Sequence, residues 1–306
     1  MRQRMTMTPD RRAGFTRPAI PVRQLTLRPD GLPPLDAVVA QPDNPTGVLV
    51  YFPGFNTPLG PWEMAKCQFL AEASSKTVIL TEIPGMSRFR DPIPKAIRKD
   101  MQHGRSESWA ELMLTYIAAG VEEAGPAEVG VLSVLGFSTG CSLAVSALPR
   151  LAEWGPIEAL NLVEPVAITQ RNLASLHLHN MADFGRMAAV NSTNSHHEWV
   201  LHTRQRQRKE PGIHYSAPDL LAIAAVLASD TLLAELRSTP LERCALARGA
   251  RSSLCPARDY DQLDGLLDAQ AIPGPTITVE GLGHQMWHSF PVVVQLTRAM
   301  MGWVKE

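Results

Sequence analysis

A strand that runs directly into a glycine-flanked serine constrains this chain more than any other feature. Residues 129–135 are apolar and are typical of a buried strand; the chain continues as Gly136-Phe-Ser-Thr-Gly140 and then as a helix-forming run rich in small residues. Glycines two positions before and after Ser138 let the backbone pass closely on both sides of a sharp turn. The segment therefore predicts a strand, a tight turn and a helix, with the Ser138 hydroxyl at the tip of the turn.

Strand-like and helix-like runs alternate before this turn. Predicted strands occupy 22–27, 35–40, 47–52 and 77–81, and predicted helices occupy 62–73 and 106–123. The run at 47–52 is apolar on both faces, which is typical of a central strand in a sheet that is covered on both sides. Because a β-α-β-α-β order implies right-handed crossovers, the sequence predicts an α/β protein with a doubly wound, mostly parallel sheet.

The alternation is interrupted once, after a predicted strand at 159–163. It resumes with strands at 244–248 and 276–279, a helix at 259–269 and a last helix at 291–304. An insertion between consecutive strands of such a sheet is expected over the carboxyl edge, where these folds bind ligands. We therefore predict a poorly ordered N-terminal extension (1–21), a core (22–166 and 241–306) and a mainly helical lid (167–240).

Together these features resemble the α/β-hydrolase superfamily over residues 22–304. The turn at Ser138 matches the nucleophile elbow of that family, and Leu49-Val-Tyr-Phe-Pro-Gly-Phe55 matches a strand that usually ends in His-Gly, with Pro53 in place of the histidine. The resemblance implies that Ser138 is a nucleophile. It also implies an oxyanion hole formed by the backbone N–H groups of Phe55 and Thr139.

A serine hydroxyl is a weak nucleophile and needs a base within hydrogen-bond reach. Among the nine histidines, His284 follows a strand and a Gly281-Leu-Gly283 turn, just before the last helix. The α/β-hydrolases carry their catalytic histidine in this late loop, so the resemblance implies His284 as the base. His288, four residues on, is expected to be a packing neighbour.

The aspartate that usually completes the triad is missing. In most α/β-hydrolases the aspartate stands in a G-x-x-D-x-x-x-P segment after the strand that follows the insertion. Here that segment reads Gly249-Ala-Arg-Ser-Ser-Leu-Cys-Pro256, so Ser252 stands where the aspartate is expected. Glu164 ends the strand after the elbow, where some α/β-hydrolases, including certain haloalkane dehalogenases, carry their acid. Asp259 begins the following helix and is the alternative acid, and a Ser–His dyad is the third possibility. We favour Glu164.

Composition restricts the class of partner. The formal net charge is −1, which offers no global attraction to nucleic acid or to an anionic membrane. No run is long enough to span a bilayer, and the N-terminus lacks the apolar segment of a secretory signal. Four scattered cysteines predict reduced, mostly buried thiols. We expect a cytoplasmic protein with a small-molecule substrate and no cofactor or metal; the sequence does not specify its oligomeric state.

An activated serine beside an oxyanion hole supports acyl transfer, in which an acyl-enzyme forms and water releases it. Hydrolysis of an ester or thioester of a small, lipophilic substrate is the simplest version. Amide hydrolysis, carbon–carbon cleavage and non-hydrolytic biosynthetic chemistry remain open, because one fold hosts all of them. A degenerate binding protein is also open, since the usual aspartate is absent. The basic stretch Arg204–Lys209 is expected to be a solvated surface.

Overall fold

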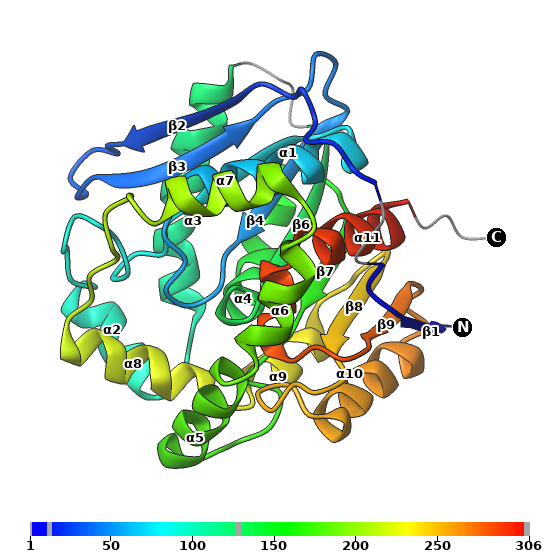
Figure 1. Cartoon of the computed structure of the whole chain (residues 1–306). Coiled ribbons are helices and arrows are strands. Elements are labelled where there is room, and N and C mark those ends of the chain that lie inside the picture. Colours follow the sequence, from blue (N-terminus) through cyan, green and yellow to red (C-terminus); the bar gives the residue numbers. More distant parts are fainter. Residues whose placement is uncertain (1, 11–13, 126–129, 303–306) are drawn as a thin grey trace.

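A single sheet organises the molecule (Figure 1). The computed structural model describes residues 2–10, 14–125 and 130–302. Val129, the predicted start of one strand, and Val304, the predicted end of the last helix, lie outside the described residues. Within the described residues, nine strands have the order β1-β9-β8-β7-β6-β4-β5-β3-β2. They are β1 (Gln3–Met7), β2 (Val22–Leu27), β3 (Leu35–Ala40), β4 (Gly47–Phe52), β5 (Thr77–Thr81), β6 (Val131–Phe137), β7 (Ile157–Val163), β8 (Cys244–Gly249) and β9 (Pro275–Val279).

The sheet is mostly parallel, as predicted. Only the pairs β2–β3 and β3–β5 are antiparallel among these strands. Strands β3, β4, β5 and β8 are buried along their whole length, and in β4 this burial agrees with a continuous apolar run. The predicted α/β class with a doubly wound sheet is therefore confirmed.

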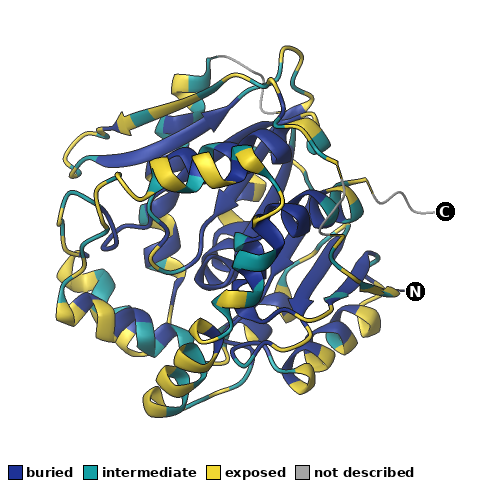
Figure 2. Cartoon of the chain, viewed as in Figure 1, coloured by how far each residue is buried: buried dark blue, intermediate teal, exposed yellow. Residues whose placement is uncertain are grey.

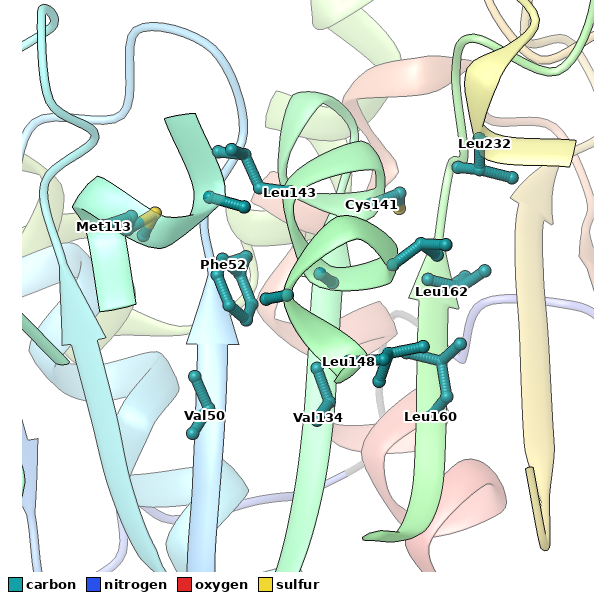
Figure 3. Packing of buried hydrophobic residues seen from close by; sticks show 14 of the residues in the cluster. Val50, Phe52, Met113, Val134, Cys141, Leu143, Leu148, Leu160, Leu162 and Leu232 are labelled. Atoms are coloured by element: carbon teal, nitrogen blue, oxygen red, sulfur yellow. The ribbon is translucent and has the colours of Figure 1, made fainter. Parts of the chain in front are cut away.

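Helices cover both faces of the sheet. The helices α1 (Pro61–Ser74) and α11 (Phe290–Met301) pack on one face, and α3 (Glu107–Ala124), α4 (Thr139–Trp154) and α10 (Ala257–Ala269) pack on the other. Because successive side chains of a strand point to opposite faces, Val48 and Val50 of β4 join one core, whereas Leu49 and Tyr51 join the other. Figure 3 shows side chains of α4 lying over β4, β6 and β7. This packing holds the helix that begins at the predicted elbow.

The N-terminal residues differ from the prediction. We expected poor order before Val22, but β1 pairs in parallel with β9 and adds a strand at that edge of the sheet. Arg2 is buried and forms an ion pair with Asp264 of α10 at 2.6 Å. Its guanidinium also donates to the carbonyl of Cys244 at 2.8 Å. The strand QRMTM is polar and short, so its local pattern contained no signal for a partner near the other end of the chain.

The chain between β7 and β8 is helical. Its helices are α5 (Leu173–Phe184), α6 (Met187–Asn194), α7 (Glu198–Gln207), α8 (Ala217–Leu227) and α9 (Thr231–Ser238). The helix α6 contacts α11 and the short 3-10 helix η1 (His284–His288), α7 contacts α1, and α8 contacts α2 (Lys95–Gln102). The outer faces of α5 and α8 are exposed (Figure 2). That this insertion acts as a lid remains a prediction.

The four cysteines are free and buried, as expected. Burial raises the pKa of the Cys244 thiol to about 12, so this thiol is protonated at neutral pH. No helix in the described part of the chain combines the length and the apolarity that crossing a lipid bilayer requires.

Candidate active site

The predicted elbow is present at the end of β6. Ser138 follows the last strand residue and has φ 54° and ψ −120°, outside the conformations that residues with side chains normally adopt. Thr139 is the first residue of α4. A Cβ atom on Gly140 would lie 2.0 Å from the carbonyl oxygen of Phe52, so only glycine allows α4 to start this close to the end of β4. The strained turn therefore presents the Ser138 side chain at the carboxyl edge of the sheet.

The loop after β4 lies directly against the elbow. A Cβ atom on Gly54 would be 2.7 Å from the Phe137 ring and 3.4 Å from Cβ of Ser138. Phe55, the next residue, is half-buried, and its ring lies 5.8 Å from that of Tyr215 in the insertion. The N–H of Thr139 belongs to the first turn of α4, where N–H groups have no partner within the helix. The two predicted oxyanion donors thus lie on the two segments that meet at Ser138.

His284 lies within hydrogen-bond distance of Ser138. Its Nε2 atom is 2.7 Å from Ser138 Oγ, and its Nδ1 atom is 2.9 Å from Glu164 Oε2. An ionised carboxylate can only accept, so this contact favours a proton on Nδ1 and leaves Nε2 to accept from the serine hydroxyl. His284 and Glu164 are both buried, and the Phe137 ring stacks beside the imidazole at a centroid distance of 5.8 Å.

Glu164 is held by hydrogen bonds to residues that follow the insertion in the sequence. It follows β7 with φ 53° and is completely buried. One carboxylate oxygen accepts from the backbone N–H of Gly249, and the other accepts from Ser252 Oγ at 2.6 Å as well as facing His284. Ser252 Oγ in turn accepts from the N–H of Cys255 at 3.0 Å. Ser252, at the position where the resemblance implied an aspartate, therefore contacts the carboxylate that faces His284.

Asp259, the alternative acid, is engaged elsewhere. Its Oδ2 atom accepts from Thr169 Oγ1 at 2.8 Å and forms an ion pair with Arg171. Both partners lie between β7 and α5. Asp259 therefore ties the start of the insertion to α10, and the structure does not bring it to the His284 ring.

Asp183 of α5 is a site residue that the sequence did not suggest. It is completely buried, and its Oδ2 accepts from the backbone N–H groups of Ser253 and Leu254, each at 2.9 Å. Its Oδ1 faces the backbone N–H of His284 at 3.3 Å and the Arg186 guanidinium at 3.0 Å. One carboxylate of the insertion thus holds the two loops that carry Ser252 and His284. No local motif marks such a residue, because all but one of its partners lie far away in the chain.

His288 is a packing neighbour of the site. Its ring lies 5.8 Å from that of Phe137 in an edge-on arrangement. Burial, followed by the positive charge of Lys66, lowers the pKa of His288 well below its usual value, so this side chain is neutral at physiological pH. Within the described residues, no three His, Cys, Asp or Glu side chains are grouped so that they could hold a metal ion.

No protein-family model matches the chain, and no curated protein matches it by sequence. Similarity to solved structures is extensive. An esterase of Pyrobaculum calidifontis has 16% identity and a TM-score of 0.53, with 92% of this chain and 85% of the esterase covered. An esterase of Pyrococcus furiosus has 13% identity and a TM-score of 0.56, with 94% of each chain covered.

A bromoperoxidase of Bacillus anthracis is similar to the same extent. It has 14% identity and a TM-score of 0.55, with 90% of this chain and 99% of the bromoperoxidase covered. At these identities the likeness concerns the fold, which different reactions share. The sheet order, the elbow after β6 and the coverage of these structures agree: the chain has the α/β-hydrolase fold.

Proposed function

We propose that the protein is a serine hydrolase that cleaves carboxylic esters or thioesters of small, lipophilic substrates. The observation that carries the proposal is the buried chain of contacts from Ser138 Oγ to His284 at 2.7 Å and from His284 to Glu164 at 2.9 Å. Such a chain supplies a nucleophile, a base and a carboxylate that orients the base. Similarity to structures named as esterases supports ester hydrolysis as the reaction.

In the proposed mechanism, Ser138 Oγ attacks the carbonyl carbon of the substrate while its proton passes to His284 Nε2. The negative charge that develops on the carbonyl oxygen is stabilised by the N–H groups of Phe55 and Thr139. Glu164 stabilises the imidazolium that forms, and His284 then gives its proton to the departing alkoxide or thiolate. Water, deprotonated by His284, attacks the acyl-enzyme, and the returning proton restores the Ser138 hydroxyl.

The first test uses p-nitrophenyl esters from acetate to palmitate. We expect the wild-type protein to hydrolyse at least the shorter esters, and we expect Ser138→Ala to lose this activity. A fluorophosphonate probe should label the wild-type protein at Ser138 and leave Ser138→Ala unlabelled, since the probe reacts with an activated serine. A folded wild-type protein that hydrolyses no ester and takes up no probe would contradict the proposal.

The second test assigns the acid. We expect Glu164→Gln to lower kcat by roughly 10,000-fold, the scale of loss when a triad acid becomes an amide. Asp259→Asn is the matched control, because Asp259 is also a buried carboxylate near the insertion but contacts Thr169 and Arg171 instead of His284. We expect this control to keep kcat within a few-fold of wild type. The reverse ranking of the two variants would exclude Glu164 as the acid.

A further inference from the structure

A cavity of about 330 Å³ lies between α1, the loop after β4 and the insertion helices α6 and α7. Thr57 and Pro58 line it from the loop that carries Phe55, and His288 lines it from η1, which begins at His284. The cavity is therefore bordered by the same two segments that carry a proposed oxyanion donor and the proposed base. None of Ser138, His284, Phe55 and Thr139 lines it, so a substrate bound in the cavity would reach Ser138 by extending along these two segments.

Two guanidinium groups of the insertion line this cavity. Arg204 and Arg208 are four residues apart at the end of α7, so they project from the same side of the helix, and both line the cavity. Arg204 is half-buried. Neither side chain forms an ion pair with a carboxylate of the described residues. Two like charges at this spacing repel each other, and an anion between them would relieve the repulsion. The basic stretch Arg204–Lys209, which we predicted to be a solvated surface, thus forms part of a cavity wall.

The other titratable groups of the wall leave this positive charge uncompensated. Glu63 lines the cavity, but its Oε1 atom forms a buried ion pair with Lys66 at 2.7 Å, and this pair has no net charge. His288 is neutral, because burial lowers its pKa. The lining residues therefore carry the two positive charges of Arg204 and Arg208 and the negative charge of Glu63, which Lys66, a residue outside the lining, compensates.

Part of the wall is apolar and suits a hydrocarbon chain. Pro58, Trp62 and Met187 contribute apolar surface beside the two guanidinium groups. Guanidinium groups recognise carboxylates through paired, charge-assisted hydrogen bonds. We propose that this cavity binds the free carboxylate of a substrate whose ester or thioester bond is cleaved at Ser138, which makes the substrate a half-ester of an aliphatic dicarboxylic acid. This inference rests on the proposed function and names the substrate class.

Two matched esters test the inference: mono-p-nitrophenyl adipate and its methyl-capped form, which differ only in the free carboxylate. We expect kcat/KM of the wild-type protein to be at least about tenfold higher for the free acid, the scale of one charge-assisted hydrogen bond, and we expect the difference to lie in KM. Arg204→Gln and Arg208→Gln should remove most of the preference and leave hydrolysis of the capped ester nearly unchanged.

Arg206→Gln is the matched control. Arg206 is on the same helix and is exposed, but it does not line the cavity. Net charge and the favourable interaction of a cation with the C-terminus of α7 change equally in all three variants. Equal rates for the two esters in the wild-type protein, or an equal loss of preference in Arg206→Gln, would overturn the inference while leaving the esterase proposal intact.

A binding measurement keeps the inference testable if the protein hydrolyses no ester. Isothermal titration of Ser138→Ala with adipate should give a saturable signal that Arg204→Gln weakens at least about tenfold and that Arg206→Gln preserves. Absence of adipate binding by the folded protein would refute the carboxylate site whatever the catalytic activity. Binding without any ester hydrolysis would support the site and refute the proposed function.

Discussion

The carboxylate that faces His284 comes from the strand before the insertion, and the loop after the insertion supports it. Removing a carboxylate from water is costly unless donors replace the water. Glu164 has three such donors: the Gly249 N–H, the Ser252 hydroxyl at 2.6 Å and the His284 ring at 2.9 Å. Ser252, at the position where the family resemblance implied an aspartate, thus belongs to the same hydrogen-bond network as a hydroxyl donor.

This arrangement predicts that an acid can be moved between the two positions. In the Glu164→Gln background, Ser252→Asp should recover at least about tenfold of the lost kcat, because Ser252 Oγ lies 2.6 Å from the oxygen that faces His284. In the wild-type background the same substitution should slow the enzyme, since two adjacent carboxylates repel each other and one binds a proton.

The four proteins form a double-mutant cycle, with kcat for p-nitrophenyl butyrate as the measurement. A positive coupling between the two substitutions is the expected result. If the double variant folds, as judged by circular dichroism, and is no faster than Glu164→Gln alone, then position 252 cannot present an acid to His284.

At the scale of the elements, the insertion helix α5 contacts the loops of the site. Its buried Asp183 accepts hydrogen bonds from the backbone of Ser253, Leu254 and His284. Each of these N–H groups belongs to a loop that either supports Glu164 or carries the proposed base. One helix of the insertion therefore contacts the loops on which the candidate site is built.

We predict that Asp183→Ala lowers kcat for p-nitrophenyl esters at least about tenfold at a temperature where the variant is fully folded, because the His284 loop loses an anchor. The matched control is Asp219→Ala. Asp219 is also completely buried on an insertion helix and is paired with an arginine, Arg98, but it contacts neither loop of the site. Both variants should lower Tm, and only Asp183→Ala should lower kcat. Equal effects of the two variants on kcat would show that Asp183 only stabilises the insertion and does not position the His284 loop.

At the scale of the whole molecule, a buried carboxyl and a half-buried one make stability depend on pH. Burial raises the pKa of Glu82, which follows β5, to about 7, and it raises the pKa of Glu235 in α9 to about 7. A raised folded-state pKa means that the native protein holds the proton more tightly than the unfolded chain does. The stability that each group contributes is fully present below its unfolded pKa, near 4.5, and is lost as pH rises through about 7.

The expected outcome for Glu82→Gln follows from the raised pKa of the Glu82 carboxyl. Glutamine does not titrate, so the free energy of unfolding of the variant, relative to wild type, should rise by up to about 3 kcal/mol between pH 5 and pH 8. Urea unfolding at the two pH values measures this difference. Glu122→Gln, at an exposed position near the end of α3, is the control and should show no such change. A pH-independent difference for Glu82→Gln would show that its carboxyl is ionised in the native protein throughout this range.

Local patterns in the sequence were sufficient for most of the fold. Runs such as 47–52 and 77–81 are apolar on both faces, and they form strands buried by helices on both sides. The strand β1 was missed, because its polar residues find a partner only in β9, near the other end of the chain. Its order depends on contacts such as Arg2 with Asp264, which join residues 262 positions apart.

By itself, the sequence determined the features whose physics is local: the strand-turn-helix at Ser138, the late turn before His284 and the alternation of strands and helices. Tertiary structure alone brought Glu164, and not Asp259, to the His284 ring, placed Asp183 against both site loops, and turned Arg204 toward a cavity. The reason is the range of the interactions. The contact between His284 and Glu164 joins residues 120 positions apart, and the cost of burying a carboxylate is offset only when the whole fold brings its donors together.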